Sequence, residues 1–428
     1  QSVLPKDNKD DDDDNQNANQ SNGIDDLINL TNMALSDSFV GDNFDDIAGN
    51  GLSNAFNNLS KINIVAIGKS GVGKSTLINN FFRGHLAATG IGVPVTQRIT
   101  PLTTPNSPLT IYDTPGLELN PSQQKELKND IIKLVKDGYK TKDLNKYIHC
   151  IWYCISSGSC RFEESEKKFI QELTDETSLY QVPVFIILTQ SYKKSSSLEL
   201  KRVIESENLK VINIIPVVAQ IKKIGKSVCR PYGLDVLTEE MGKSLPEALK
   251  MSFNNVQISS LAYKRKCAAA IIAASVASSA AVGGSPIPFS DCFLLAGVEV
   301  AMLSSITAIY NLDITRGFIT AFISCAIGCT SASLIGRTIV VNIIKCIPIA
   351  GSIVGGVVGG VTGAILTGAL GSTYLLVIEA VMKGEIDPKK ISKEELQAFI
   401  KPMFKKNIDD EKKKEEKKKL EEKEKKKK

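Results

Sequence analysis

One stretch of this sequence says most about its fold, Gly68-Lys69-Ser70-Gly71-Val72-Gly73-Lys74-Ser75. The run before it, 62–67, is apolar and β-branched, and the run after it, 76–82, carries apolar residues at helical spacing. A glycine-rich turn between a strand and a helix points successive backbone N–H groups inward, where they bind phosphate oxygens. The spacing G-x-x-x-x-G-K-S therefore predicts a loop that binds a nucleoside triphosphate.

Two side chains of this loop have predicted chemical roles. Lys74 supplies positive charge to the β- and γ-phosphates, and Ser75 supplies a hydroxyl to the Mg2+ ion that bridges them. The ion needs an acidic ligand at the end of a neighbouring strand, and Asp113 follows the strand-like run 109–112. In Asp113-Thr114-Pro115-Gly116, the N–H of Gly116 can reach the γ-phosphate. The predicted phosphate and metal contacts are Gly68, Lys69, Ser70, Gly71, Val72, Gly73, Lys74, Ser75, Thr76, Asp113 and Gly116.

The two motifs together resemble the Era-like branch of the P-loop GTPases. The resemblance implies GTP and GDP as ligands, Mg2+ as cofactor, GTP hydrolysis, and a switch threonine that reaches the ion in the triphosphate state. Thr96 stands where the family places this threonine, although the nearby Thr100, Thr103 and Thr104 compete. Because 98–104 also reads as an edge strand, each threonine has a purely structural alternative. The resemblance thus implies Lys74, Thr96 and Gly116 as the catalytic set and Ser75, Thr96 and Asp113 as metal ligands.

The base-reading motif departs from the family pattern. The family specifies guanine with Asn/Thr-Lys-x-Asp after the fifth strand, whereas here 184–188 is followed by Thr189-Gln190-Ser191-Tyr192. The threonine fits, but no carboxylate stands at Tyr192 to read the base. Ala219, in the run 217–220, is a weak match to the next base-contacting loop. Thr189, Gln190 and Ala219 are therefore base contacts by resemblance only, and an ATP-binding relative stays open.

A second departure concerns catalysis. Ras-like proteins orient water with a glutamine after Asp-x-x-Gly, but this chain has Leu117, which cannot do so. We expect slow intrinsic hydrolysis, completed by a partner or a second copy of the chain, with Arg83 or Arg98 as candidate groups; binding without turnover is the alternative. No other catalytic set competes, because the chain has only two histidines, His85 and His149, and His149 is predicted to be a buried strand residue.

The order of patterns predicts an α/β domain followed by an all-α domain. Helix-like segments at 121–136, 162–176 and 195–206 alternate with the strand runs, which indicates a mostly parallel sheet with helices on both faces. The predicted parts are a disordered, acidic and Asn-rich N-terminus with short helices (1–59), a GTPase domain (60–232), a hydrophobic helical domain (233–404) and a Lys/Glu tail (405–428).

The helical domain is the part that suggests a membrane. No charged residue occurs from 346 to 378, which is long enough to span a bilayer, and glycines recur every fourth residue at 351, 355, 359 and 363. A soluble bundle with tight helix packing is the alternative. The layout resembles a branch in which an Era-like domain precedes a hydrophobic helical domain of unknown function. It is more distantly similar to the immunity-related GTPases, and that similarity implies membrane association and self-association.

Charge and cysteine usage argue against several other classes. The tail 411–428 holds eleven Lys and six Glu, which accounts for the whole net charge of +5. Without a basic stripe interleaved with aromatic residues, nucleic-acid binding is not expected. The nine cysteines form no C-x-x-C pair, and no secretory signal is visible. We expect an intracellular protein, in the cytoplasm or on the cytoplasmic face of a membrane.

Overall fold

The computed structural model describes residues 44–83, 98–105, 107–117, 120–159, 161–225, 227–282, 291–330 and 360–425. The chain divides into two compact units, which we describe separately. One is Leu59–Lys264, and the other joins the segment up to Asn58 with Arg265–Lys428. Several predicted features lie outside the described residues, namely Thr96, His85 and the glycines at 351, 355 and 359.

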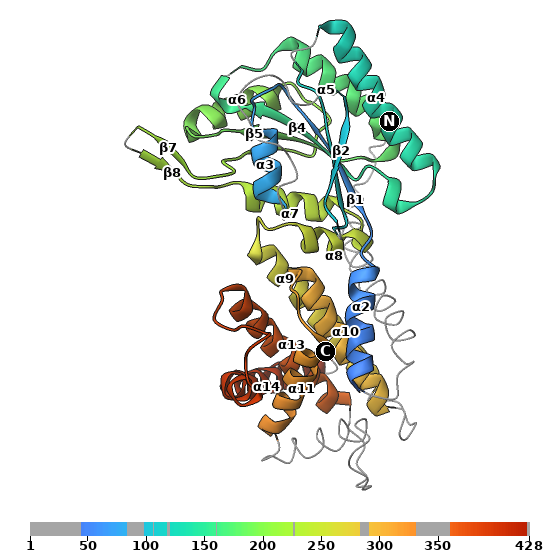
Figure 1. Cartoon of the computed structure of the whole chain (residues 1–428), viewed down its shortest axis with the longest axis vertical. Helices are drawn as coiled ribbons and strands as arrows, with labels where there is room; N and C mark the ends of the chain where they lie inside the picture. Colours follow the sequence, from blue (N-terminus) through green and yellow to red (C-terminus); the bar gives the residue numbers. More distant parts are fainter. Residues whose placement is uncertain are drawn as a thin grey trace, which may run out of the picture. The chain divides into compact units, whose positions relative to one another are not determined.

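The first unit, which we call the sheet unit, is built on six strands in the order β2-β3-β1-β4-β5-β6 (Figure 1). The strands are β1 Ile62–Ile67, β2 Thr100–Thr103, β3 Leu109–Asp113, β4 Cys150–Ser156, β5 Val184–Thr189 and β6 Asn213–Pro216. All neighbouring pairs are parallel except β2 with β3. The predicted α/β fold with a mostly parallel sheet is confirmed, and so is the predicted edge strand before β3.

The helices of the sheet unit are α3 Lys74–Phe81, α4 Pro121–Lys140, α5 Glu164–Thr177, α6 Lys194–Ser206, α7 Leu234–Ser244 and α8 Glu247–Val256. Local sequence explains where they begin. Asn120 and Gln123 form a capping box before α4, with Pro121 at its first position, where a missing N–H costs nothing. Short 3-10 turns lie at Leu144–Lys146, Ser157–Ser159 and Ser178–Tyr180.

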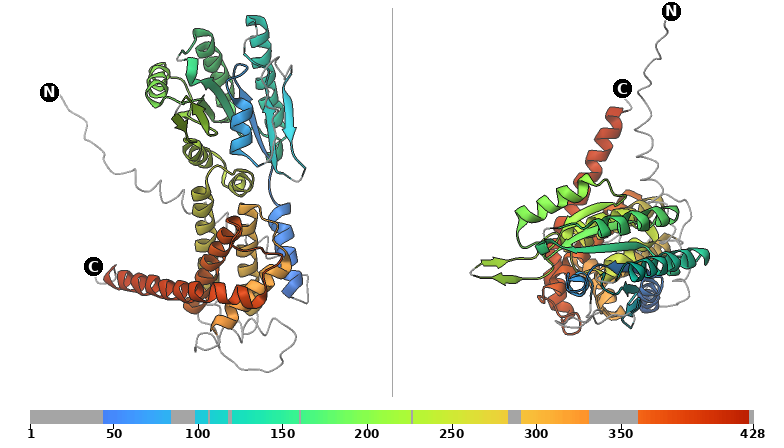
Figure 2. Two further views of the ribbon diagram at one scale, coloured as in Figure 1. Left: turned by 60° about the vertical axis from the view of Figure 1, so that its left-hand side comes forward. Right: turned by 90° about the horizontal axis from the view of Figure 1, so that it is seen from above.

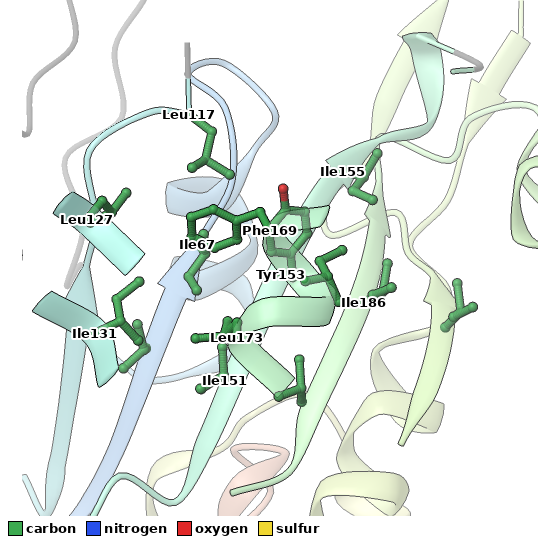
Figure 3. Packing of buried hydrophobic residues seen from close by; sticks show 14 of the residues in the cluster. Ile67, Leu117, Leu127, Ile131, Ile151, Tyr153, Ile155, Phe169, Leu173 and Ile186 are labelled. Carbon is green, nitrogen blue, oxygen red and sulfur yellow. The ribbon is translucent and has the colours of Figure 1, made fainter. Parts of the chain in front are cut away.

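One face of the sheet packs against α4, α5 and α6. Alternate residues of each strand point to this face, so Ile67 of β1 and Tyr153 of β4 meet Ile131 of α4 and Leu173 of α5 (Figure 3). The strands therefore read as nearly continuous apolar runs, because their other residues are buried on the opposite face.

The opposite face of the sheet is covered by an aromatic cluster. Phe81 and Phe82 pack on Trp152 of β4 with ring centroids 5.1 and 5.5 Å apart, and Phe253 of α8 lies 6.2 Å from Phe81. Helices α7 and α8 belong to the same compact unit, which extends beyond the boundary at residue 232 drawn from the sequence. Tyr263 fits against Gly242 of α7, where a side chain would collide with its ring.

The second unit, the helical unit, contains α2 Phe44–Asn57, α9 Leu261–Val282, α10 Asp291–Tyr310, α11 Arg316–Thr330, α13 Gly360–Met382 and α14 Lys393–Lys425; the first four residues of α9 fall in the sheet unit. Helix α2, one helix of 14 residues, packs on α10 so closely that a Cβ on Gly51 would lie 2.6 Å from Val300. Figure 2 shows α14 as one continuous helix that includes most of the Lys/Glu tail.

Helix α13 is tied to its neighbours by buried hydrogen bonds. Tyr374 pairs with Thr307 of α10 at 2.7 Å, and Thr367 pairs with Ser279 of α9 at 2.8 Å. Gly371 leaves room for Ile272 and Met302. Among the described residues, one helical stretch, Gly363–Met382, is long and apolar enough to cross a membrane; its mean hydropathy is 1.7, and 67% of its 18-residue window is buried inside the protein. A core helix of a soluble bundle meets the same criteria.

The helical unit also buries a carboxyl group. Glu299 of α10 is 8% exposed, and burial raises its pKa to about 7.

Candidate nucleotide-binding site

The phosphate-binding loop follows β1 and ends where α3 begins. Gly68, Gly71 and Gly73 all have positive φ, at 148°, 71° and 100°. Gly68 is also required by space, because a Cβ atom there would lie 2.4 Å from the carbonyl oxygen of Cys154 in β4. The loop therefore lies directly over the end of β4 and leads into the N-terminus of α3, where unpaired N–H groups favour an anion.

Lys74 lies across this loop. Its Nζ donates to the carbonyl oxygens of Gly68 and Lys69 at 2.7 and 3.1 Å. The ammonium group is thus already at the loop that binds phosphate, and a nucleotide would exchange these carbonyls for phosphate oxygens. This geometry agrees with the predicted role of Lys74.

The predicted metal ligands Ser75 and Asp113 lie at the same edge of the sheet. Asp113 ends β3 beside Ala66, the penultimate residue of β1, and Ser75 is in the first turn of the helix that follows β1. Thr114 fixes this junction, because its N–H and hydroxyl both donate to the carbonyl of Ala66 at 3.3 and 2.9 Å. The oxygen donors of Ser75 and Asp113 suit Mg2+, whose other positions would be filled by phosphate oxygens and water. The described residues contain no cluster of three or more His, Cys, Asp or Glu that would form a protein-only metal site.

The residue after Gly116 is buried in the core. Leu117 is 4% exposed and belongs to the cluster that includes Ile67 and Phe169 (Figure 3). Its carbonyl accepts a hydrogen bond of 2.9 Å from Gln124 of α4. The hydrophobic effect therefore favours burial of this side chain in the core between the sheet and its helices. The position that carries a water-orienting glutamine in Ras-like proteins contributes to packing instead.

The two candidate arginines have different surroundings. Arg83 follows α3, whose eight residues place it about 12 Å along the axis from the phosphate-binding loop, and its N–H donates to Val256. Arg98 lines a cavity of about 700 Å³ between β2 and α4, together with Tyr112 and Pro115. Arg98 is therefore the candidate closer to the Asp113–Gly116 motif.

The base-reading positions are engaged with the phosphate-binding loop. The Thr189 hydroxyl donates to the carbonyl of Val72, and the Gln190 amide donates to the carbonyl of Gly71 at 2.8 Å. Gln190 has a φ of 52°, and its side-chain oxygen accepts from Ser156 at 3.2 Å. These two residues therefore link the end of β5 to the phosphate-binding loop. The side-chain amide of Gln190 is thus hydrogen-bonded to protein groups.

The loop after β5 carries no acidic residue from 189 to 194. Tyr192 is half-buried, and burial raises its pKa. The carbonyl of Ser191 accepts from the Tyr232 hydroxyl at 2.6 Å, and the thiol of Cys229 lies 4.0 Å from the carbonyl of Tyr192. Ala219 is half-buried one residue after the Val218–Tyr232 bridge. The structure thus places no carboxylate within the stretch where the family reads guanine.

Sequence reasoning missed the partners of Lys69. Its Nζ lies 2.6 Å from Glu163 and 3.7 Å from Glu166, both at the start of α5. The hydrogen bond from Lys69 lowers the pKa of Glu163, whereas burial raises the pKa of Glu166. Because this lysine side chain is engaged with α5, its predicted contact with nucleotide would come from its backbone. The sequence does show acidic residues at the start of α5, but nothing in it indicated that they contact Lys69 of the phosphate-binding loop.

His149 is a structural residue, as predicted. It is 5% exposed and lies just before β4, where its Nδ1 accepts from the N–H of Asn63 and its Nε2 donates to the carbonyl of Leu144, both at 3.0 Å. Burial lowers its pKa to about 4, so the ring is neutral at physiological pH.

Residues 63–190 match the sequence profile of the 50S ribosome-binding GTPase family. No curated protein matches the chain in sequence.

Solved structures that resemble the chain include the following three. Era of Aquifex aeolicus bound to GDP and AlF4- is 19% identical, with 54% of this chain and 71% of that chain covered and a TM-score of 0.31. Toc33 of Arabidopsis thaliana with Mg2+ and GMPPNP is 16% identical, with 49% and 95% covered and a TM-score of 0.29. LeoA, a bacterial dynamin GTPase from ETEC, is 11% identical, with 91% and 77% covered and a TM-score of 0.33.

The profile match covers the phosphate-binding loop, the Asp113–Gly116 motif and the strand that ends at Thr189. These elements lie together at one edge of a mostly parallel sheet. Residues 63–190 therefore belong to a P-loop domain that matches a GTPase family, and a helical C-terminal region follows it.

Proposed function

We propose that this protein binds GTP with Mg2+, hydrolyses it slowly, and acts as a membrane-associated switch whose turnover is stimulated by a partner or by self-association. One observation carries the proposal. Gly68–Ser75 and Asp113–Gly116 carry the residue types of a phosphate and metal site, whereas Leu117 at the water-orienting position is buried.

Slow hydrolysis follows from that combination. Phosphoryl transfer is catalysed mainly by positioning and by charge, and this site supplies the lysine, the loop N–H groups and the metal ligands. Leu117, at the position that orients the attacking water in Ras-like proteins, cannot do so. GTPases with an incomplete site turn over on the order of 10⁻² s⁻¹ or more slowly. We expect a partner or a second copy to supply the missing group, beside Arg98 and the cavity that it lines.

The switch role rests on Gly116. This buried glycine lies three residues after Asp113, the proposed metal ligand, and directly before Leu117, which is buried in the core. A γ-phosphate would accept a hydrogen bond from the N–H of Gly116. Loss of this phosphate on hydrolysis would release the segment leading to α4. Thr96, outside the described residues, is proposed to respond to the same phosphate.

Membrane association is proposed from the apolar helical unit, on the cytoplasmic face of an intracellular membrane. The helix Gly363–Met382 supports it by length and composition. Two alternatives have their own observations: a nucleotide-binding scaffold without turnover is favoured by the buried Leu117, and an ATP-binding relative by the absence of a carboxylate at Tyr192.

The test is equilibrium binding of GTP, GDP and ATP to the full chain with Mg2+, followed by phosphate release at increasing protein concentration. Preferential GTP binding with turnover that rises per molecule as concentration rises supports the assembly-stimulated GTPase. Binding without turnover at every concentration, with or without vesicles, contradicts hydrolysis and leaves the scaffold. Equal affinity for ATP and GTP contradicts guanine selectivity.

A further inference from the structure

A small hairpin in the sheet unit contributes only Cys229, next to Tyr192, to the site described above. It consists of β7 Lys222–Ile224 and β8 Ser227–Cys229, which pair only with each other and form a separate two-stranded sheet. Figure 1 shows it projecting from the sheet unit, and along the chain it lies between β6 and α7. A two-stranded hairpin with no packed face is marginal alone in water, so its anchoring and its surface chemistry both need explanation.

The hairpin exposes aliphatic side chains among basic ones. Ile221, Ile224 and Val228 are 64%, 47% and 55% exposed. The sequence from 220 to 231 carries four basic residues and no acidic one. An exposed aliphatic group that is surrounded only by positive charge suits a negatively charged surface with an apolar interior.

Both faces of the hairpin share this character. Cross-strand partners lie on the same face, so Lys223 and Val228 share one face of the hairpin. Residues two apart in a strand also share a face, so Lys222 and Ile224 lie together on the other. A protein partner would cover one face of such a ribbon. A lipid headgroup layer surrounds an inserted element, and lysine stems can lie along aliphatic groups while their ammonium ends reach phosphates. The mixture of basic and aliphatic side chains on both faces of the hairpin therefore favours a lipid surface over a protein as its partner.

The hairpin is fixed at its base. Val218 and Tyr232 exchange two backbone hydrogen bonds of 3.1 Å, and the Tyr232 hydroxyl donates to Ser191. Lys194 lies 4.9 Å above the Tyr232 ring and adds a further positive charge at this end. The exposed tip is therefore held by a rigid base, which is the geometry that a contact element needs.

We propose that β7–β8 is a lipid-contact hairpin that inserts Ile224 and Val228 into the headgroup layer of an anionic bilayer while its lysines bind lipid phosphates. This inference rests on the membrane association proposed above, and it assigns that contact to the sheet unit in addition to the helical unit.

The test measures binding of the full chain to phosphatidylcholine vesicles with and without phosphatidylserine. Wild type is expected to bind the anionic vesicles, and the binding is expected to weaken as salt is added. The double variant Lys222→Glu with Lys223→Glu is expected to lose about tenfold or more of this binding, and Ile224→Ser with Val228→Ser about five- to tenfold. Matched controls are Lys140→Glu with Lys142→Glu, and Ile212→Ser, which is 51% exposed in the wild type on the same unit.

A second measurement reports insertion directly. Ile224→Trp adds a fluorophore to a chain whose single tryptophan, Trp152, is fully buried. Its emission should shift to the blue and be quenched by brominated lipid, whereas Ile212→Trp should show neither change. Nucleotide binding, which uses none of these residues, verifies that each variant is folded.

The outcomes separate this inference from the proposed function. If the hairpin variants bind anionic vesicles as wild type does, the lipid-contact role is overturned while membrane association stands. If wild type binds no vesicle but hydrolyses GTP, membrane association fails along with the inference, and the GTPase remains. Self-association that disappears in the hairpin variants, without vesicle binding, would assign the hairpin to a second copy of the chain and also overturn the lipid proposal.

Discussion

The two ends of the nucleotide site differ in how closely they follow the GTPase pattern. At the phosphate end, Lys74 and the Ser75 and Asp113 pair are in place, and three glycines adopt the backbone that the loop requires. At the base end, Thr189 and Gln190 bond to the carbonyls of Val72 and Gly71, and no acidic residue follows them through Lys194.

Affinity and selectivity therefore have different sources in this site. Phosphates carry most of the charge of a nucleotide, so a site that keeps only its phosphate end can still bind tightly. Selection of guanine needs a buried acceptor for the base N–H groups, and rejection of the wrong base depends on leaving such groups unpaired. We therefore expect affinity to depend on the phosphate end, with weak discrimination at the base end.

The largest effect is expected for Lys74→Ala. The variant removes the ammonium that lies across the loop, and affinity for GTP and GDP should fall at least about 100-fold, equivalent to roughly 2.7 kcal/mol. Fluorescent-nucleotide titration measures this change. Lys61→Ala, an exposed lysine on the same unit, is the matched control and should bind normally. Unchanged affinity in Lys74→Ala would show that the phosphate end does not hold the nucleotide.

Removal of Mg2+ comes next. Chelation with EDTA should weaken GTP binding by about 10- to 100-fold, because an Mg2+ ion held by Ser75 and Asp113 would neutralise the phosphates. In Asp113→Asn the affinity should already be low and should respond little to EDTA. Isothermal titration with and without chelator compares the two proteins. A full response to EDTA in the variant would exclude Asp113 as a metal ligand.

The base end can be sharpened by Tyr192→Asp. A carboxylate at this position should raise the ratio of GTP to ATP affinity by about tenfold, or roughly 1.4 kcal/mol, since it can accept from the guanine N–H groups. Competition between the two nucleotides gives the ratio directly. Lys193→Asp controls for the added negative charge and should leave the ratio unchanged. A wild-type ratio that already exceeds 100 would contradict the view that the base end is permissive.

The smallest effect is expected for Gln190→Ala. It removes the 2.8 Å bond to the Gly71 carbonyl, and affinity should fall about two- to tenfold for GTP, GDP and ATP alike. An equal loss of affinity for the three nucleotides is expected because Gln190 supports the loop and does not contact the base. A variant that changes the GTP to ATP ratio would instead make Gln190 a base contact. Gln181→Ala, also at positive φ but on another turn, is the matched control.

The sequence predicted correctly the parts of the fold that one short-range pattern determines. The run from Ile62 to Ser75 carries strand, turn and helix signals in register, so the loop and its place in the sheet followed directly. The parallel sheet followed from the alternation of apolar runs with amphipathic segments such as Pro121–Lys140.

Features that depend on long-range contact were not accessible. The bond between Thr189 and Val72 joins residues 117 positions apart, and the Lys69 to Glu163 pair likewise joins separate elements. The hairpin strands Lys222–Ile224 and Ser227–Cys229 are three residues each, too short to show a period, and are rich in lysine. The sequence predicted only short helices within a disordered segment at 1–59, whereas α2 is a 14-residue helix whose contact with Val300 lies far along the chain.

Glu299 has a consequence for how the helical unit responds to pH. Its pKa is about 7 in the folded chain against 4.5 as its ordinary value, so the folded state holds this proton over a range where the unfolded state has lost it. Stability conferred by the protonated carboxyl is complete below pH 4.5 and declines as pH rises to 7, by about 3 kcal/mol in all. Glu299 therefore favours the folded helical unit in mild acid over neutral pH, whereas the contribution of His149 to the stability of the sheet unit falls as pH drops from 6.5 toward 4.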